Sequence, residues 1–194
     1  MIETINYINY TDYLKELLPY VKFPIDKLLL LGSGEMNADG CIEAETRLAV
    51  EWADDCLLKI KDKKGLIPIK FDAKHITEIL VPKSFDTVVM FDFLEHLVKR
   101  DGEKLLNNIE KYVKQQILMF IPLENRLRDK EDIARTVKAN KNSKKNNVSM
   151  GNHSSQWTLE EMEERGFKVL VSPFYHKERN WGAMICIKDL WQVI

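Results

Sequence analysis

Two glycines follow a run of four leucines near the start of the chain. Leu28 to Leu31 is too short for a helix and is bounded by a charge and a glycine, which is typical of a buried strand in a parallel sheet. Gly32-Ser33-Gly34 then stands at the carboxyl end of this strand, where open α/β sheets bind their ligands. Glycines permit a tight turn and let backbone N–H groups approach a ligand. The pattern indicates either a nucleotide-type site or an ordinary turn, because two spaced glycines are common.

Acids and histidines form a second group of candidates. Asp92 ends the apolar stretch Phe85–Phe91, and Glu95-His96 follow directly. Histidine can take a proton near neutral pH, but His96 could equally pack as a structural residue, with Glu95 pairing or capping on the next helix. His153 lies in a polar stretch, either as an exposed loop residue or in a lid. No pair of histidines or acids has the sequence spacing of metal ligands, so we expect no metal.

Length and composition limit the classes of protein that the chain can be. Its 194 residues suffice for one sizeable core, and 29 basic against 30 acidic residues give no field that would attract nucleic acid or an anionic membrane. Apolar runs are too short to span a bilayer. Three widely separated cysteines, Cys41, Cys56 and Cys186, argue against a disulfide framework. We expect one cytoplasmic domain over residues 1–194.

Strands alternating with helices must position the candidate residues. This alternation predicts right-handed crossovers and a mostly parallel sheet. The expected strands are 28–31, 40–43, 66–71, 85–91 and 115–121, and the expected helices are 10–21, 46–61, 75–80 and 101–114. The N-terminal segment 1–24 is helical in this scheme.

The C-terminal third departs from that rhythm. Residues 123–156 are polar and rich in Lys and Asn, which predicts a lid-like insertion. A basic stretch within it lacks the interleaved aromatics that stack on bases, so nucleic acid is not expected as a partner. Thr158, with Glu161 three residues later, predicts a capping box at the start of a helix that ends at Gly166. The last two apolar segments, 167–175 and 181–188, have a short connection that suits antiparallel strands.

Taken together, the chain resembles the class I S-adenosylmethionine-dependent methyltransferases, in their type 11/12-like branch. The resemblance rests on Asp72-Ala73, Pro82, Ser84-Phe85-Asp86 and Asp92-Phe93-Leu94-Glu95-His96-Leu97, in the family's order. Ser155-Gln156-Trp157-Thr158 before the last helix is similar to the family's C-terminal pattern.

The resemblance implies a Rossmann-like three-layer αβα sandwich. Its seven-stranded sheet has the order 3-2-1-4-5-7-6 with strand 7 antiparallel. S-adenosylmethionine would bind across the carboxyl ends of the first four strands. Only eleven positions separate Gly32 from Glu43, whereas a parallel crossover takes a dozen or more residues, so the first crossover helix is expected to be shortened or absent.

Specific residues acquire roles from this resemblance. Gly32, Ser33 and Gly34 would meet the methionine part of the cofactor, and an acid ending the second strand would accept hydrogen bonds from both ribose hydroxyls. We assign that role to Glu43, with Glu45 as the second choice. Asp72 and Ala73 would hold the adenine, and Asp92 would complete the cofactor site. An alternative reading makes residues 43–61 the first helix and Asp72 the ribose acid.

At the acceptor side, His96 is the candidate catalytic base. Glu95, His153 and Trp157 are candidates for contact with a small-molecule acceptor, although packing in the core is the ordinary role of a tryptophan. No membrane partner is expected, and a homo-oligomer is compatible with the sequence. Two other functions stay open: a methyltransferase-like binding or scaffold protein without catalysis, and another nucleotide-using α/β enzyme such as a reductase.

Overall fold

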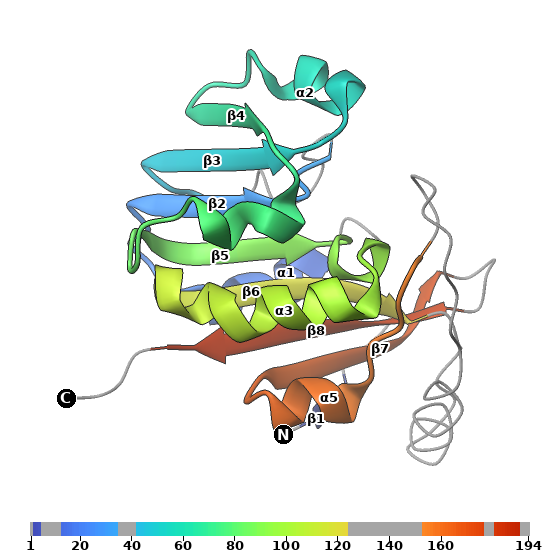
Figure 1. Ribbon diagram of the computed structural model, residues 1–194. Coiled ribbons are helices and arrows are strands. Elements are labelled where there is room, and N and C mark those ends of the chain that lie inside the picture. Colours follow the sequence, from blue (N-terminus) through green and yellow to red (C-terminus); the bar gives the residue numbers. More distant parts are fainter. Residues whose placement is uncertain (1, 5–12, 35–41, 124–152, 177–180, 191–194) are drawn as a thin grey trace.

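The computed structural model describes residues 2–4, 13–34, 42–123, 153–176 and 181–190, which form one mixed sheet with helices on both faces (Figure 1). Its strands are β1 (Ile2–Thr4), β2 (Lys27–Leu31), β3 (Thr46–Glu51), β4 (Leu66–Lys70), β5 (Phe85–Phe91), β6 (Val113–Leu123), β7 (Lys168–His176) and β8 (Trp181–Asp189). The α-helices are α1 (Tyr13–Leu17), α2 (Asp54–Ile60), α3 (Lys99–Ile109) and α5 (Leu159–Glu164). Short 3-10 helices are η1 (Leu18–Tyr20), η3 (Ala73–Glu78), η4 (Leu94–His96) and η5 (Glu110–Tyr112).

The order of the strands confirms the expected topology. The eight strands lie in the order β1-β7-β8-β6-β5-β2-β3-β4, and without β1 this is the sequence 3-2-1-4-5-7-6 read from the other edge. β8 runs antiparallel to β6 and β7, and the other pairs are parallel. The short strand β1 was not predicted; it pairs residues 2–4 with Val169–Val171 of β7.

Both faces of the sheet are buried, as the leucine run predicts. Leu29 and Leu31 face the layer of α3, η3 and α5, whereas Leu28 and Leu30 face the layer of α1 and α2. Successive strand residues point to opposite faces, so an uninterrupted apolar run marks a strand that is covered on both sides. In Figure 1, α3 and α5 lie in front of the sheet and α1 lies behind it.

The segment 40–61 folds differently from the prediction. The sequence predicts a strand at 40–43 and a helix at 46–61, but Thr46–Glu51 forms strand β3 between β2 and β4, and only Asp54–Ile60 is helical. The prediction is therefore wrong for residues 42–43 and for the first half of the helix, while Gly40 and Cys41 lie outside the described residues. Leu48, Ala49 and Trp52 recur at helical spacing by coincidence, and pairing with two neighbouring strands overrides that local pattern.

Most other expectations are close to the structure. The helix expected at 10–21 is limited to α1 and η1 among the described residues, and β6 continues through Pro122 to Leu123. The capping box at Thr158 is confirmed, since its side chain accepts from the Glu161 N–H while the Glu161 side chain accepts from the Thr158 N–H. Of the expected lid, only Leu123 and 153–156 lie within the described residues. No helix among the described residues is both long and apolar enough to span a membrane.

Candidate functional site

The glycine turn leaves β2 in a left-handed backbone conformation. Gly32 has φ +65° and Gly34 has φ +51°, a region that side chains disfavour. A Cβ on Gly32 would come within 2.2 Å of Cδ2 of Phe93, whereas a Cβ on Gly34 would meet no atom of the described residues within 4 Å. The N–H groups of Gly32 and Ser33 both donate to the Val50 carbonyl, at 3.0 and 3.3 Å. The turn is thus fixed to β3 on one side, and no described residue fills the space beside Gly34.

Glu51, the last residue of β3, holds the open part of this turn. Its Oε2 accepts a hydrogen bond from the Gly34 N–H at 2.8 Å, and its Oε1 accepts from the N–H groups of Trp52 and Ala53 at 2.7 and 2.9 Å. Glu51 stands nineteen positions after Gly32, close to the roughly 20 residues that separate the glycine turn from the ribose-binding acid in dinucleotide folds.

Sequence reasoning missed Glu51 and chose Glu43. The Glu45 N–H donates to the Ile25 carbonyl at 3.1 Å, which places this part of the chain near the amino end of β2, opposite the glycine turn. Glu43 is exposed and ends no strand, so the placement on which its predicted ribose role depended is wrong. The spacing of about 20 residues was the available signal, and the misassigned helix concealed it.

Asp72 and Ala73 lie directly after β4, as expected. Asp72 caps η3: its Oδ1 accepts from the Lys74 N–H at 3.2 Å, and its Oδ2 lies 2.8 Å from the Lys74 ammonium. The hydrogen bond that the Lys74 ammonium donates to this carboxylate, and then the charge of the carboxylate, raise the pKa of Lys74. Ala73 is buried. The reading that makes residues 43–61 the first helix is wrong, because 46–51 is strand β3.

Asp92 occupies the turn after β5 in a strained conformation. Its φ is +52°, in the left-handed region that non-glycine residues rarely adopt, and its N–H donates to the Phe120 carbonyl at 3.0 Å. Such strain costs about 1–3 kcal/mol and is concentrated at ligand sites. Because β5, β2, β3 and β4 are adjacent and parallel, the residues that follow them meet at one edge of the sheet (Figure 1).

Glu95 carries a carboxyl group inside the protein. The residue is 1% exposed, and among the described residues no group donates a hydrogen bond to either carboxyl oxygen. Burial, and then the negative charge of Asp92, raise the pKa of this carboxyl well above its usual range.

Two histidines lie beside that carboxyl. Nε2 of His96 lies 3.9 Å from Oε1 of Glu95, and the ring of His153 lies edge-on to that of His96 with centroids 5.2 Å apart. One ligand atom from each of the three residues lies within 4.8 Å of the other two. His153 is 57 positions from His96, and this separation is not a spacing typical of metal ligands in sequence.

The segment that carries His153 is fixed to η4 by backbone hydrogen bonds. The N–H groups of Ser154 and Ser155 both donate to the Glu95 carbonyl, at 2.7 and 3.0 Å. The Ser155 hydroxyl donates to the Leu94 carbonyl at 3.3 Å and accepts from the Trp157 indole N–H at 2.9 Å. The structure thus brings together three of the four predicted acceptor-side residues, Glu95, His96 and His153.

Trp157, the fourth, lies in the core. It is 3% exposed, its ring packs on Gly102 of α3, and the Lys99 ammonium lies 3.6 Å from the ring centroid. Lys99 also donates to the Gln156 carbonyl at 2.8 Å and to Oε2 of Glu161 at 2.7 Å. This burial favours a role in positioning the 153–157 segment over direct contact with a substrate.

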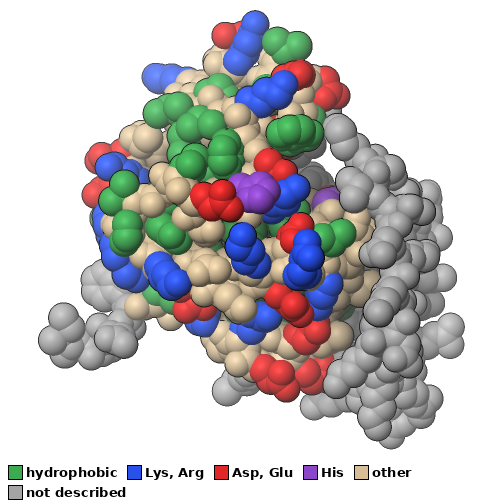
Figure 2. Space-filling model, viewed as in Figure 1, with side chains coloured by type: hydrophobic (Ala, Val, Ile, Leu, Met, Phe, Trp, Pro, Cys, Tyr) green, Lys and Arg blue, Asp and Glu red, His purple; other side chains and the backbone are tan. Residues whose placement is uncertain are grey.

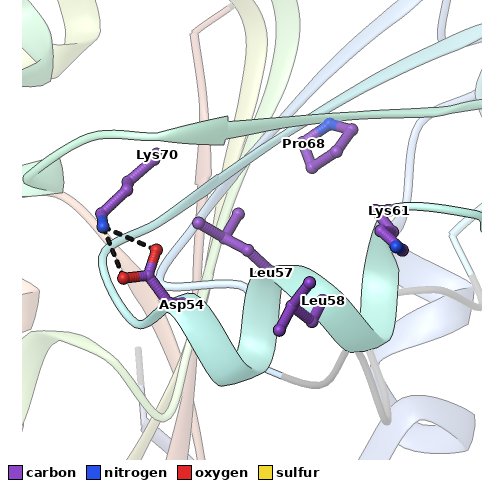
Figure 3. A pocket seen from close by; sticks show the side chains of 6 residues that line it. All are labelled: Asp54, Leu57, Leu58, Lys61, Pro68 and Lys70. Atoms are coloured by element: carbon purple, nitrogen blue, oxygen red, sulfur yellow. Dashed lines mark hydrogen bonds and ion pairs between the residues drawn. The ribbon is translucent and has the colours of Figure 1, made fainter.

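A separate hollow of about 470 Å³ lies between α2 and β4 (Figure 3). Leu57, Leu58 and Pro68 line its apolar part, and Lys70 pairs with Asp54 at 2.6 Å at one end. The hollow is open, and its charged groups are exposed and already paired or solvated, so it has the character of a surface groove at the sheet edge.

One face of the molecule shows how the exposed side chains are distributed. In Figure 2, acidic and basic side chains are mixed, and hydrophobic ones gather on the part that carries β4 and η3 in Figure 1. Exposed Ile67, Ile79 and Val81 belong to this region of the chain.

Comparisons with known proteins agree with the fold. No protein-family model matches the chain, and no curated protein matches it either. Solved structures do: a SAM-dependent methyltransferase from Methanosarcina mazei is 12% identical over 90% of this chain and 96% of that chain, with a TM-score of 0.63. One from Archaeoglobus fulgidus is 18% identical over 91% of each chain, with a TM-score of 0.56. Magnesium protoporphyrin IX methyltransferase from Synechocystis PCC 6803, solved with bound SAH, is 11% identical over 92% of this chain and 80% of that chain, with a TM-score of 0.57. The chain therefore has the fold of the class I SAM-dependent methyltransferases.

Proposed function

We propose that this protein is an S-adenosylmethionine-dependent methyltransferase that acts on a small-molecule acceptor. The observation that carries the proposal is the hydrogen bond between the glycine turn and Glu51 at the carboxyl ends of β2 and β3. The N–H of Gly34 donates to Oε2 of Glu51, and no described residue occupies the space beside Gly34. An open backbone turn next to a strand-ending acid is the arrangement that binds a nucleoside with two free ribose hydroxyls.

Each part of the cofactor finds a suitable group. Glu51 would accept hydrogen bonds from the ribose hydroxyls, and Gly32–Gly34 would border the methionine part. Asp72 and Ala73 would border the adenine, and Asp92 would close the site at β5. When bound, S-adenosylmethionine supplies an electrophilic methyl group on a sulfonium, so the protein has chiefly to align the acceptor.

The acceptor would lie beside η4 and the segment that begins at His153. His96 has a side chain that is 35% exposed next to the buried Glu95, and it can meet both solvent and a bound molecule. This supports its predicted place at the acceptor, where a general base is needed only for a nucleophile that is protonated at neutral pH. The motif from Asp72 to Leu97 supports membership of the type 11/12-like branch.

Titration calorimetry with S-adenosylmethionine and S-adenosylhomocysteine tests the cofactor site. We expect the native chain to bind both, and Glu51→Ala to weaken binding at least about tenfold, since hydrogen bonds to a charged group contribute about 1.5–3 kcal/mol each. Glu43→Ala is the matched control and should leave the affinity unchanged. This exposed acid lies two residues before Glu45, whose N–H donates to the Ile25 carbonyl near the amino end of β2, opposite the glycine turn. A melting curve for each variant shows that it is folded.

Two results would overturn this proposal. Absence of binding at millimolar cofactor would favour the alternative of a methyltransferase-like scaffold without catalysis. Loss of affinity in Glu43→Ala with none in Glu51→Ala would restore the assignment made from sequence and contradict the site described above.

A further inference from the structure

We propose that Glu95, His96 and His153 bind a divalent first-row transition-metal ion. Glu95 and His96 belong to η4, which follows β5, and His153 belongs to the segment that leads into α5. Two imidazoles and one carboxylate are a ligand set that suits Zn²⁺, Mn²⁺, Fe²⁺ or Co²⁺.

The distances are close to those around one shared ion. Ligand atoms lie about 2.0–2.2 Å from such ions, so two atoms on the same ion are separated by at most about 4.3 Å. Nε2 of His96 is 3.9 Å from Oε1 of Glu95, within that limit, and all three ligand atoms lie within 4.8 Å of one another. Small rotations of the side chains would complete the coordination.

The buried carboxyl of Glu95 independently calls for a cation. It is 1% exposed, and among the described residues no group donates a hydrogen bond to either of its oxygens. Buried charged groups in proteins are paired or coordinate metals, because an uncompensated carboxylate in the interior is costly. A metal ion would satisfy these oxygens.

The backbone holds the ligands in place without any contribution from the ion. The Glu95 carbonyl accepts from both Ser154 and Ser155 N–H groups, which fixes His153 next to η4. In addition, the Ser155 hydroxyl donates a hydrogen bond to the Leu94 carbonyl and accepts one from the indole of Trp157, which packs on α3. These contacts hold the two segments that carry the proposed ligands next to each other.

Three protein ligands would leave open coordination positions for water or for an acceptor oxygen. A metal-bound hydroxyl loses its proton far more readily than a free one, which would favour hydroxyl-bearing acceptors. This role of the ion rests on the methyltransferase function proposed above, whereas binding of the ion does not. With its nitrogen on the metal, His96 could not also accept a proton, so a ligand role would replace the general-base role.

The test uses the full chain without a polyhistidine tag, first freed of metal with a chelator. Titration with Co²⁺, followed by visible absorption, and calorimetry with Zn²⁺ and Mn²⁺ should show one ion per chain and a rise in melting temperature on binding. Glu95→Gln, which keeps the shape of the side chain, and His153→Ala should weaken binding at least about tenfold. His75→Ala is the control, because His75 pairs with Glu78 at 2.9 Å outside the cluster, and it should bind as the native chain does.

If the native chain binds none of these metal ions, the proposed metal site is wrong. It is also wrong if the native protein, Glu95→Gln and His153→Ala bind the ions equally well. Cofactor titration on the metal-free protein separates this from the proposed function. Cofactor binding without metal binding removes only the metal site, and metal binding without cofactor binding removes only the methyltransferase proposal.

Discussion

Gly32 and Gly34 have similar backbone angles but different surroundings, and substitution should separate their roles. Gly32→Ala places a methyl group against Phe93, where the Cβ would lie 2.2 Å from Cδ2, and it also strains the left-handed backbone. We expect it to lower the free energy of unfolding by about 2–4 kcal/mol, as overpacking and the left-handed penalty combine. Urea denaturation measures this change.

Gly34→Ala should instead affect binding more than stability. A Cβ there meets nothing within 4 Å, so the cost is the backbone penalty of about 1–2 kcal/mol. The methyl group would, however, occupy the open space proposed for the cofactor, and affinity for S-adenosylhomocysteine should fall at least tenfold relative to the native chain. Equal affinity in calorimetry would contradict the placement of the cofactor against this turn.

At the scale of elements, Asp86 joins the amino ends of β2 and β5. Its Oδ2 accepts from the N–H groups of Asp26 and Lys27 at 3.0 and 2.8 Å, and its Oδ1 lies 2.9 Å from the Lys114 ammonium. Burial alone would raise the pKa of Asp86, but the Lys114 hydrogen bond and these N–H groups outweigh it and lower the pKa. The Ser84-Phe85-Asp86 motif thus contributes to the fold rather than to the candidate site.

The lowered pKa predicts how stability depends on pH. A carboxyl with a lower pKa in the folded state stabilises it above the unfolded pKa, about 3.9, and loses this contribution as pH falls through the folded pKa. Asp86→Asn should therefore cost about 2 kcal/mol at pH 7. The difference from the native chain should shrink below about pH 4 in urea denaturation, and a constant difference would show that the charge is not responsible.

Gly102 is the position at which α3 packs against Trp157 of the 153–157 segment. Gly→Ala inside a helix usually stabilises by about 0.5–1 kcal/mol, but here the Cβ would lie 2.6 Å from Cζ2 of Trp157. We expect Gly102→Ala to be destabilising by about 1–3 kcal/mol and to weaken Co²⁺ binding by moving the 153–157 segment. Lys104→Ala, at an exposed position of the same helix, should change neither property in melting and Co²⁺ titration.

Elements that depend on local signals were predictable, and those that depend on distant partners were not. The capping box at Thr158 and the leucine run of β2 are local, and both are confirmed. Strand β3 forms because it pairs with β2 and β4, so the helical spacing of its apolar residues led to a wrong prediction of a helix. For the same reason Glu51 was not recognised as the acid that ends a strand. The cluster of Glu95, His96 and His153 depends on backbone hydrogen bonds between segments far apart in sequence.

For the whole molecule, topology was predictable because the motif Asp72–Leu97 resembles a known family, whereas the added edge strand had no such signal. β1 has three residues and pairs with β7 through residues 2–4 and Val169–Val171. It covers the edge of β7, which would otherwise present unpaired N–H and C=O groups to another chain.

Removal of β1 should therefore change the self-association of the protein more than its affinity for the cofactor. A variant lacking residues 1–4 should lose about 1–2 kcal/mol of unfolding free energy, the worth of a few backbone hydrogen bonds, and should self-associate through the exposed edge of β7. A variant lacking residues 191–194 is the control, because it removes no described strand. Sedimentation velocity measures association, and calorimetry should show unchanged cofactor affinity, since β1 and the β2–β3 site lie at opposite sides of the strand order. A monomeric, equally stable truncated chain would mean that β1 does not protect the edge of β7.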